Sequence, residues 1–371
     1  YETKYKKMIE TFSHFLTRKN HKKLNDIIYI KAYKDPPRCI KVPFEHNGCK
    51  FTKNIKKANL IWKLYKFDKM ITLTKSLNIF QKYNHFPKTF QLGRKDNLWK
   101  NFKKFKRKFP NDYDFHPQAY ILPEELTEYK SFSKQNPSMP WIIKPLASSR
   151  GRGIRLLVNN DDIPKEGLVC RYIEKPHLIN NKKYDLRIYV LITSHCPLKI
   201  YLFKEGLVRF ASEEYTKKNK ENIFIHLTNY SVNKKNKNYQ KCDDDDSGSK
   251  WTLSAYQKYF IENDNEDLHK ILWEKIKDVI VKTLIIANED LVSCTKVCTK
   301  FDNSLFEIYG FDIMIDNEFN PWLLEVNVNP SLNCDTDLDY NVKTNLITDV
   351  INIVGVRPFS EEAFEEVNKN E

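Results

Sequence analysis

Two carboxylates and an asparagine in the last third of the chain are candidate metal ligands or catalytic groups, because these polar residues fall within strongly apolar segments. Residues 305–315 and 322–328 both predict β-strands, and the polar run between them predicts a turn. A hairpin symmetric about this turn places Asp312 opposite Glu325. Side chains alternate along a strand, so Asn327 shares the face of Glu325. We therefore expect three oxygen-bearing side chains to converge.

Two neighbouring buried carboxylates repel each other unless a cation neutralises them. Oxygen donors of this kind suit a hard cation, and Mg²⁺ usually takes one or two carboxylates together with phosphate oxygens and water. The alternative is a solvent-facing acidic patch. The apolar flanking residues disfavour that alternative: Phe311, Ile313, Leu323, Leu324, Val326 and Val328. The pattern therefore predicts a magnesium site formed by Asp312, Glu325 and Asn327.

Residues 141–156 (WIIKPLASSRGRGIRL) predict a strand, a glycine-containing loop and a second strand. Gly151 and Gly153 permit a close approach of the backbone to phosphates, and Lys144 supplies positive charge. The segment is neither a Walker A loop nor a dinucleotide fingerprint, because no helix follows the glycines. Alone it is a weak signal, but next to a magnesium site it predicts phosphate binding.

Alternation along the segment KYDLR places Lys183, Asp185 and Arg187 on one strand face. Such a row is either a surface ion-pair ladder, which stabilises little in water, or part of a site for phosphate and carboxylate. Arg209, in a short predicted strand at 207–210, could join it.

Two further segments have both a functional and an ordinary interpretation. Residues 168–174 (LVCRYIE) predict a strand that could pair with adenine through its backbone, or any buried strand. Residues 225–233 (IHLTNYSVN) offer His226, Thr228 and Asn229 in a dense polar set, and a plain loop fits them as well.

Helices and strands are predicted on both sides of these motifs. Residues 1–25 and 97–109 are very basic, and their apolar residues have helical spacing, which predicts helices. Residues 26–33 predict a strand. Further strands are expected at 186–193 and 199–203. Residues 268–291 have the periodicity of a helix. Its apolar positions form a stripe that we expect to pack against the core: Ile271, Leu272, Ile276, Val279, Ile280 and Leu284. The polar segments 217–222 and 234–250 read as loops, and Asp243–Asp246 lack the spacing of a calcium loop.

The composition excludes several classes of protein. With 371 residues, 41% hydrophobic, the chain can fold as more than one lobe, and its apolar runs are too short to span a bilayer. We expect no signal peptide, and eight cysteines without a CxxC pair indicate reduced thiols in an intracellular protein.

The positive charge is concentrated in residues 1–110, which hold 29 Lys and Arg against 7 Asp and Glu. The candidate acidic partners are nucleic acid, anionic lipid and an acidic protein tail. Genomic base bias on a solvated face explains the same charge equally well.

The motifs taken together resemble one family. The segments KPLASSRGRGI, KYDLRIYVLITS, GLVRFA, HLTNYSVNK and YGFDIMIDNEFNPWLLEVNVNPSL, with NHFPKTFQLGRKDNLWKN and YILPEE upstream, are similar to the tubulin tyrosine ligase-like family, and most to its polyglutamylase branch. The resemblance covers roughly residues 80 to 355. It implies an α/β, ATP-grasp-like fold with an N-terminal basic lobe (1–92), a central lobe with the phosphate loop (93–182) and a C-terminal lobe (183–371) that carries the magnesium and amino-acid site.

The resemblance also implies a role for each site residue. Asp312, Glu325 and Asn327 match the magnesium ligands. The residues implied in ATP binding are Lys95, Lys144, Ser149, Arg150, Gly151, Gly153, Cys170, Arg171, Tyr172, Ile173, Lys183 and Asp185. Those implied for the amino-acid substrate are Arg187, Arg209, His226, Thr228 and Asn229, and those implied in catalysis are Lys144, Arg187, Arg209 and Asn229. Cys170 departs from the family, which usually carries glutamine there, so side-chain discrimination of the base is put in doubt.

The implied function is an ATP-dependent, ADP-forming tubulin polyglutamylase that uses Mg²⁺, free L-glutamate and the acidic C-terminal tails of tubulin or microtubules. A monomer is expected, without nucleic acid or membrane as a partner, in the cytoplasm and cytoskeleton, cilium or basal body included. The alternatives are a ligase using glycine, tyrosine or a non-tubulin acceptor, and a catalytically silent microtubule-binding protein. A nucleic-acid binder rests only on net charge and aromatic residues, without a recognisable module.

Overall fold

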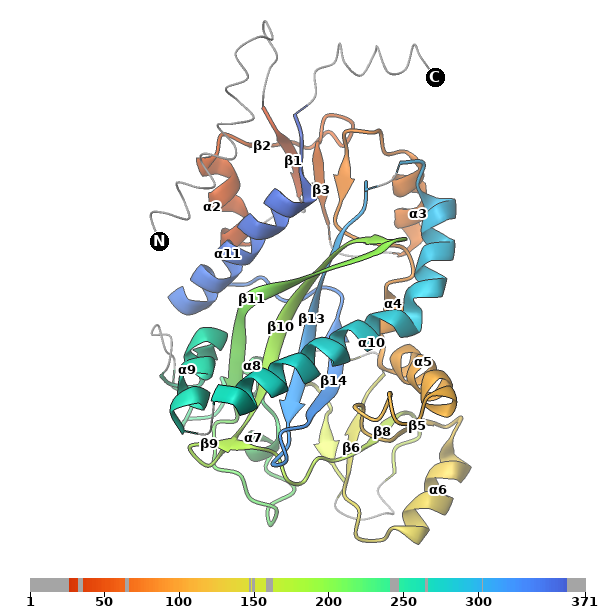
Figure 1. Ribbon diagram of the computed structural model, residues 1–371, viewed down its shortest axis with the longest axis vertical. Helices are drawn as coiled ribbons and strands as arrows, with labels where there is room; N and C mark the ends of the chain where they lie inside the picture. The colour runs from red at the N-terminus through yellow and green to blue at the C-terminus, as the bar shows by residue number, and fades with distance from the viewer. Residues whose placement is uncertain are drawn as a thin grey trace, which may run out of the picture.

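In the computed structural model, the apolar runs within the described part of the chain form three β-sheets, which follow one another along the long axis of the molecule (Figure 1). The structure describes residues 27–32, 36–63, 67–146, 148, 151–157, 163–240, 247–263, 266–301 and 303–358. The helix predicted for residues 1–25 and the acidic run Asp243–Asp246 lie outside these described residues.

The N-terminal sheet is parallel, and its strand order is β2-β1-β3-β4. Its strands are β1 (Tyr29–Ala32), β2 (Lys50–Phe51), β3 (Leu60–Trp62) and β4 (Lys82–Tyr83), with helices α2 (Arg38–His46) and α3 (Phe67–Lys75). The C-terminal helix α11 (Asp337–Val354) lies beside α2, and the two bury apolar side chains such as Ile40 and Val350 in one cluster (Figure 1). The two ends of the described chain therefore stabilise each other.

The central sheet is antiparallel, in the order β5-β8-β6-β7. Its elements are α4 (Phe90–Gly93), α5 (Lys95–Lys108), β5 (Ala119–Leu122), α6 (Leu126–Gln135), β6 (Trp141–Lys144), β7 (Arg155–Leu156) and β8 (Gly167–Arg171). Helix α5 confirms the basic helix predicted at 97–109, and it buries Leu98, Trp99 and Phe102. Strand β7 follows the glycine loop directly, as the sequence predicts.

The large sheet has the order β12-β11-β10-β13-β14, with β9 (Leu178–Ile179) paired to β10. Its other strands are β10 (Lys182–His195), β11 (Leu198–Phe210), β12 (Lys250–Thr252), β13 (Glu307–Ile315) and β14 (Pro321–Asn327). The strands predicted separately at 199–203 and 207–210 form one strand, β11, whose register with β10 shifts at a bulge. Strand β10 is the buried centre of the sheet and carries the predicted Lys-Asp-Arg row.

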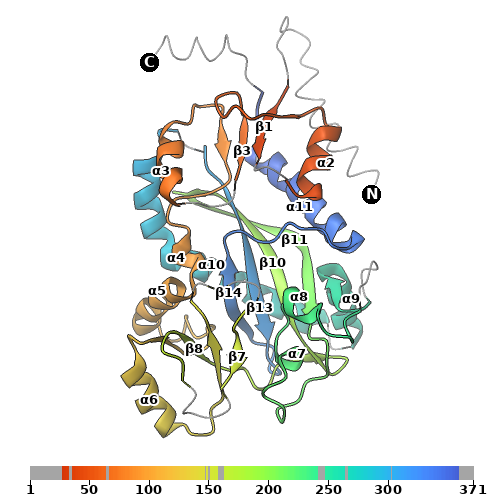
Figure 2. The same ribbon diagram turned by 180° about the vertical axis from the view of Figure 1, so that it is seen from behind.

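Helices cover both faces of this sheet. The helix α10 (Glu266–Cys298) lies across one face (Figure 1), while α7 (Ile223–His226) and α8 (Tyr230–Asn233) lie on the other, as Figure 2 shows from behind. Helix α9 (Leu253–Asn263) precedes α10. The predicted stripe of α10 is buried except at Ile271, which is 54% exposed. The prediction for Ile271 was wrong because this position lies one residue, about 100° of rotation, away from Leu272 on the rim of the stripe.

The lobe boundaries predicted at 92/93 and 182/183 stay a prediction.

The cysteines within the described residues carry free thiols, including Cys294 and Cys298 on one face of α10, with their sulfurs 3.8 Å apart. None of the helices that the structure describes combines the length and apolarity needed to span a bilayer.

Candidate active site

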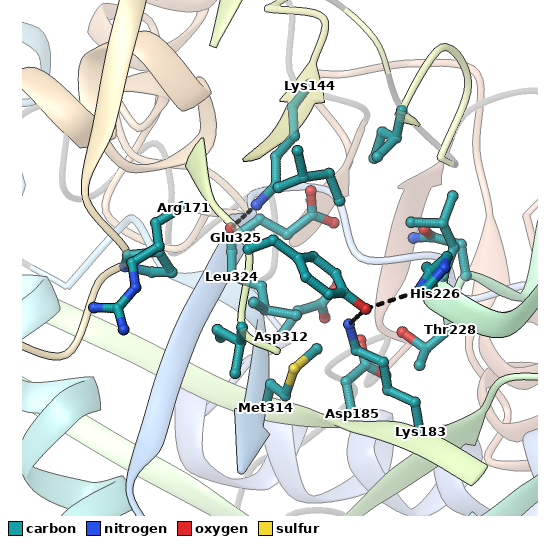
Figure 3. A pocket seen from close by; sticks show the side chains of 17 residues that line it. Lys144, Arg171, Lys183, Asp185, His226, Thr228, Asp312, Met314, Leu324 and Glu325 are labelled. Carbon is teal, nitrogen blue, oxygen red and sulfur yellow. Dashed lines mark hydrogen bonds between the residues drawn. The ribbon is translucent and has the colours of Figure 1, made fainter. Parts of the chain in front are cut away.

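A cleft lies between the central sheet and the large sheet, and its space, which includes a part open to solvent, measures about 630 Å³. Figure 3 shows its side chains reaching in from β6, from the segment after β8, from β10, from the α7–α8 region and from the β13–β14 hairpin. The lining residues are Pro117, Ile142, Lys144, Ile154, Arg171, Tyr172, Ile173, Lys183, Asp185, His226, Leu227, Thr228, Asn229, Asp312, Met314, Leu324 and Glu325.

The carboxylate hairpin is formed by β13 and β14, and Asp312 pairs with Glu325 as the sequence predicts. The register shifts immediately afterwards, so that Ile313 pairs with Leu323. A symmetric hairpin would pair Ile313 with Leu324, so that part of the prediction was wrong. Leu324 is an extra residue in the ladder, and such a bulge re-aims the neighbouring groups. Its side chain lines the cleft, and its carbonyl oxygen accepts a hydrogen bond from Lys144 Nζ at 3.3 Å.

The two carboxyl groups of the hairpin lie within hydrogen-bonding reach of each other, and their pKa values are shifted in opposite directions. Burial alone would raise the pKa of Asp312, but the cations of Arg187 and Arg209 outweigh it and hold this pKa well below its usual range. Burial, together with the Asp312 charge, raises the pKa of Glu325. Asn327 donates its amide hydrogens to Glu325 Oε1 at 3.3 Å and to the Gly310 carbonyl at 3.2 Å.

The Lys-Asp-Arg row is buried, so the surface-ladder alternative is wrong. Arg187 donates from Nε to Asp312 Oδ1 at 2.5 Å and from Nη2 to Oδ2 at 3.0 Å. Arg209 donates from Nε to Asp185 Oδ1 at 2.8 Å, and its Nη2 contacts both Asp185 Oδ2 and Asp312 Oδ2, the latter at 2.8 Å. A Cβ at Gly310 would stand 3.2 Å from Arg187 Cδ, so glycine leaves room for this side chain. Asp185, Arg187, Arg209 and Asp312 therefore form one buried network of balanced charge.

The glycine loop reaches the hairpin through Lys95, the first residue of α5. Its Nζ donates to the Ser148 carbonyl at 3.0 Å and lies 3.8 Å from Glu325 Oε2. Gly151 has φ +73, and a Cβ there would meet Asn229 Oδ1 at 2.8 Å, so this position requires glycine. Ser149 and Arg150 lie outside the described residues.

Lys183, Tyr172 and His226 meet on one wall of the cleft. Lys183 Nζ donates to the Tyr172 hydroxyl at 3.0 Å, and that hydroxyl lies 2.8 Å from His226 Nδ1, as the dashed lines in Figure 3 mark. Burial lowers the pKa of Lys183 to about 7, assisted by Lys144 and opposed by Asp185. Burial also lowers the pKa of His226.

The remaining predicted residues divide between the cleft and its surroundings. Arg171, Ile173, Thr228 and Asn229 line the cleft. Cys170 is buried in the core and, like Arg187 and Arg209, is not among the lining residues that the structure describes. The two arginines lie behind Asp312, where they neutralise carboxylates of the protein.

The donor set suits a cation that takes most of its ligands from elsewhere. Among the described residues no group of three or more His, Cys, Asp and Glu side chains could hold a metal ion by itself. Asp312 and Glu325 with the Asn327 amide make a two-carboxylate set, which fits Mg²⁺ when phosphate oxygens and water complete its shell. Apolar walls beside several cations suit a nucleoside triphosphate.

Comparison with known proteins decides the family. The model of the tubulin-tyrosine ligase family matches residues 72–363. The chain belongs to the tubulin-tyrosine ligase family. This family has an ATP-grasp-like fold, so the predicted fold class and family are confirmed.

Individual relatives carry more specific names. The tubulin monoglutamylase TTLL4 of Homo sapiens is 44% identical over 289 residues, which are 76% of this chain and 24% of that protein. The tubulin polyglutamylase TTLL5 of Mus musculus is 44% identical over 292 residues, 76% of this chain and 22% of that protein. A probable beta-tubulin polyglutamylase of Tetrahymena thermophila is 42% identical over 288 residues, 74% of this chain and 24% of that protein. The chain thus spans about a quarter of the length of these relatives.

The apolar wall of the cleft was not predicted from the sequence. It is formed by Pro117, Ile142, Ile154, Met314 and Leu324. Met314 could have been found, because it lies two residues after Asp312 and shares its strand face. Leu324 could not, because only the bulge turns it toward the cleft.

Proposed function

We propose that this chain is an ATP-dependent, ADP-forming ligase domain that joins free L-glutamate to glutamate side chains in the acidic C-terminal tails of tubulin. The observation that carries the proposal is the arrangement of Asp312 and Glu325 opposite Lys95, Lys144 and Lys183 around one cleft. Relatives named as tubulin monoglutamylases and polyglutamylases support glutamate as donor and tubulin as acceptor.

ATP fits the cleft by its chemistry. The apolar side chains of Ile142, Met314 and Leu324 offer a surface for a flat base, and Lys144 and Lys95 offer charge for the phosphates. Asp312, Glu325 and Asn327 would hold Mg²⁺, which when bound neutralises charge on the transferring phosphoryl group. The segment after Cys170 supplies the backbone that would meet the base.

The proposed reaction has two steps. A carboxylate oxygen of the acceptor glutamate attacks the γ-phosphorus of ATP, the bond to the β-γ bridging oxygen breaks, and ADP leaves an acylphosphate behind. The amino group of free glutamate then attacks the acyl carbon, loses a proton, and expels inorganic phosphate as the amide forms. Lys144 and Lys95 stabilise the charge on the phosphates. The side chains of Lys183, Thr228 and Asn229, which line the cleft, position the reactants.

The basic first third of the chain is proposed to attract the acidic tail. Several lysines of α5 already pair with carboxylates within the chain, such as Lys100 with Glu124 at 2.9 Å and Lys106 with Asp114 at 2.6 Å. The attraction to tubulin therefore comes from the excess of basic residues over these pairs. Because exposed charges are screened by salt, microtubule binding should weaken as salt rises from about 50 to 200 mM. Unchanged binding over this range would contradict the steering role.

We propose a monomer that works in the cytoplasm on the cytoskeleton, cilium or basal body included. The decisive experiment incubates the chain with ATP, Mg²⁺ and tubulin, offers glutamate, glycine or tyrosine separately, and measures the mass of the tails. We expect a mass gain with glutamate only. A gain with glycine or tyrosine would reassign the donor, and microtubule binding without any gain would indicate a catalytically silent protein.

A further inference from the structure

A single chain of hydrogen bonds runs along one wall of the cleft and ends on the backbone. Lys183 Nζ is 3.0 Å from the Tyr172 hydroxyl, which is 2.8 Å from His226 Nδ1, and His226 Nε2 is 2.8 Å from the Asn219 carbonyl oxygen. The three side chains are at most 6% exposed. They come from β10, from the segment after β8 and from α7, so the chain ties three parts of the site together (Figure 3).

The direction of this chain follows from its last bond. A carbonyl oxygen only accepts, so His226 Nε2 must carry the hydrogen that points at Asn219. Burial lowers the pKa of His226, opposed by the hydrogen bond to Asn219 and assisted by Lys183, which favours the neutral imidazole. A neutral imidazole has one N–H, so Nδ1 is an acceptor and takes the hydroxyl hydrogen of Tyr172.

Tyr172 then has no hydrogen left for Lys183. Its hydroxyl stays protonated because burial raises its pKa, and its oxygen can only accept from Lys183. The neighbouring Tyr215 hydroxyl also hydrogen-bonds to Tyr172, but its own hydrogen is donated to the Glu174 carbonyl at 2.8 Å, so toward Tyr172 it can only accept. Tyr172 then shares its one hydrogen between His226 and Tyr215 and still has none for Lys183. In each of the three hydrogen bonds from Lys183 to the Asn219 carbonyl, the donor is therefore on the side nearer to Lys183.

We infer that His226 is a positioning residue which, through Tyr172, fixes the direction in which Lys183 presents its remaining N–H groups to the nucleotide. The family resemblance implies that His226 sits near the phosphates and the bound amino acid. Both of its ring nitrogens are instead engaged within the protein, so a contact with the amino acid would break one of these bonds. The inference rests on the proposed function, because it takes ATP as the ligand of the cleft.

The test compares four variants of the 371-residue chain: His226→Leu, His226→Asn, Tyr172→Phe and the double variant Tyr172→Phe/His226→Leu. Leucine removes the imidazole acceptor for Tyr172 and leaves the Tyr215 oxygen, whereas asparagine would place its side-chain oxygen near the position of Nδ1 and retain that acceptor. The Kd for ATP with Mg²⁺ is measured by titration calorimetry, which needs no turnover. The KM for glutamate is measured from initial rates, and thermal unfolding checks that each variant folds.

We expect His226→Leu and Tyr172→Phe each to weaken ATP binding by about three- to tenfold, the effect of losing one hydrogen bond. His226→Asn should bind ATP within about twofold of the unaltered chain, a difference below the effect of one hydrogen bond. The double variant should bind no more weakly than either single one, because both changes break the same chain. The KM for glutamate should stay within about twofold throughout, since no contact with the amino acid is lost.

A raised KM for glutamate with unchanged ATP affinity in His226→Leu would overturn the inference and restore a direct contact with the amino acid. Additive losses in the double variant would also overturn it. If His226→Leu does not fold, Tyr172→Phe and His226→Asn decide, since the first must weaken ATP binding and the second must not. Absence of ATP binding by the unaltered chain would overturn the proposed function, and the inference with it.

Discussion

Arg187 and Asp312 lie opposite each other on β10 and β13, and the guanidinium group holds the carboxylate by two hydrogen bonds of 2.5 and 3.0 Å. Arg209 adds a second cation, 2.8 Å from the same carboxylate, and also holds Asp185. The charges of these four residues balance. Within the described residues, Glu325 forms an ion pair with Lys95 at 3.8 Å, and Arg187, which is committed to Asp312, acts on Glu325 more weakly. Glu325 is therefore the carboxylate whose charge most needs a metal ion.

Loss of the Arg187 guanidinium should destabilise the fold. In Arg187→Met, Asp312 keeps only Arg209, and breaking a buried ion pair by removing one partner costs about 3–5 kcal/mol of unfolding free energy. Lys100→Met is the matched control, because its pair with Glu124 is about half exposed on both sides and worth at most about 1 kcal/mol. Urea unfolding of both variants measures the difference. Equal losses would contradict the buried network.

Much of the carboxylate hairpin could be predicted from sequence, because two apolar runs around a polar turn leave one main way to pair. The pairing of Asp312 with Glu325 followed from that symmetry. The bulge at Leu324 could not be predicted, since it has no signature in residue type or periodicity. It is set by tertiary contacts, among them the hydrogen bond from Lys144 to the Leu324 carbonyl.

The ion pairs inside the site could also not be predicted from the sequence. Alternation put Lys183, Asp185 and Arg187 on one face, but it could not say that Arg209 holds Asp185 while Arg187 holds Asp312. These pairings depend on which strands become neighbours in the large sheet. In the same way, the family resemblance implied that His226 lies near the site, but it could not show that both ring nitrogens are engaged by the protein.

Removing the charge of Glu325 should abolish ligation without harming the fold. In Glu325→Gln the metal site loses its least compensated negative charge, so we expect the rate of tail modification to fall by about 100-fold or more. The fold should be as stable or more stable, because burial and Asp312 disfavour the charged form of Glu325. Mass spectrometry of the tails and thermal unfolding measure the two effects.

The matched control for that variant is Glu318→Gln, which removes an exposed carboxylate from the turn of the same hairpin. It should leave the rate within about twofold, since a surface charge in high dielectric changes little. Full activity of Glu325→Gln would contradict the magnesium assignment, and a loss of activity in both variants would point to the hairpin fold instead of the charge.

The activity should depend on pH through Lys183. Its pKa is about 7, because burial outweighs Asp185 and Lys144 acts with burial, so it loses its positive charge as pH rises through neutrality. Tyr172 and His226 face it as uncharged groups. A cation attracts ATP, so kcat/KM for ATP should fall on the alkaline side of about pH 7.

Lys183→Arg tests this assignment, because arginine stays charged throughout the range and should remove the alkaline fall. Lys183→Met should give a low and flat profile, and serves if arginine does not fit the buried position. The pH profiles of the three proteins are compared with one another, so the titration of ATP itself, which is the same in all three, cancels. The same alkaline fall in all three proteins would assign the dependence to another group.

Cys170 should be chemically inert and dispensable for nucleotide binding. Burial raises its thiol pKa, and reactivity depends on the thiolate, so iodoacetamide should leave Cys170 unlabelled in the folded chain while it labels the exposed Cys196. Because Cys170 is not among the described residues that line the cleft, Cys170→Ala should change the KM for ATP by no more than about twofold. Peptide mass spectrometry after labelling and initial rates with ATP measure the two effects. A large rise in that KM, with normal thermal unfolding, would mean that the thiol itself contacts the base, where the family usually carries glutamine.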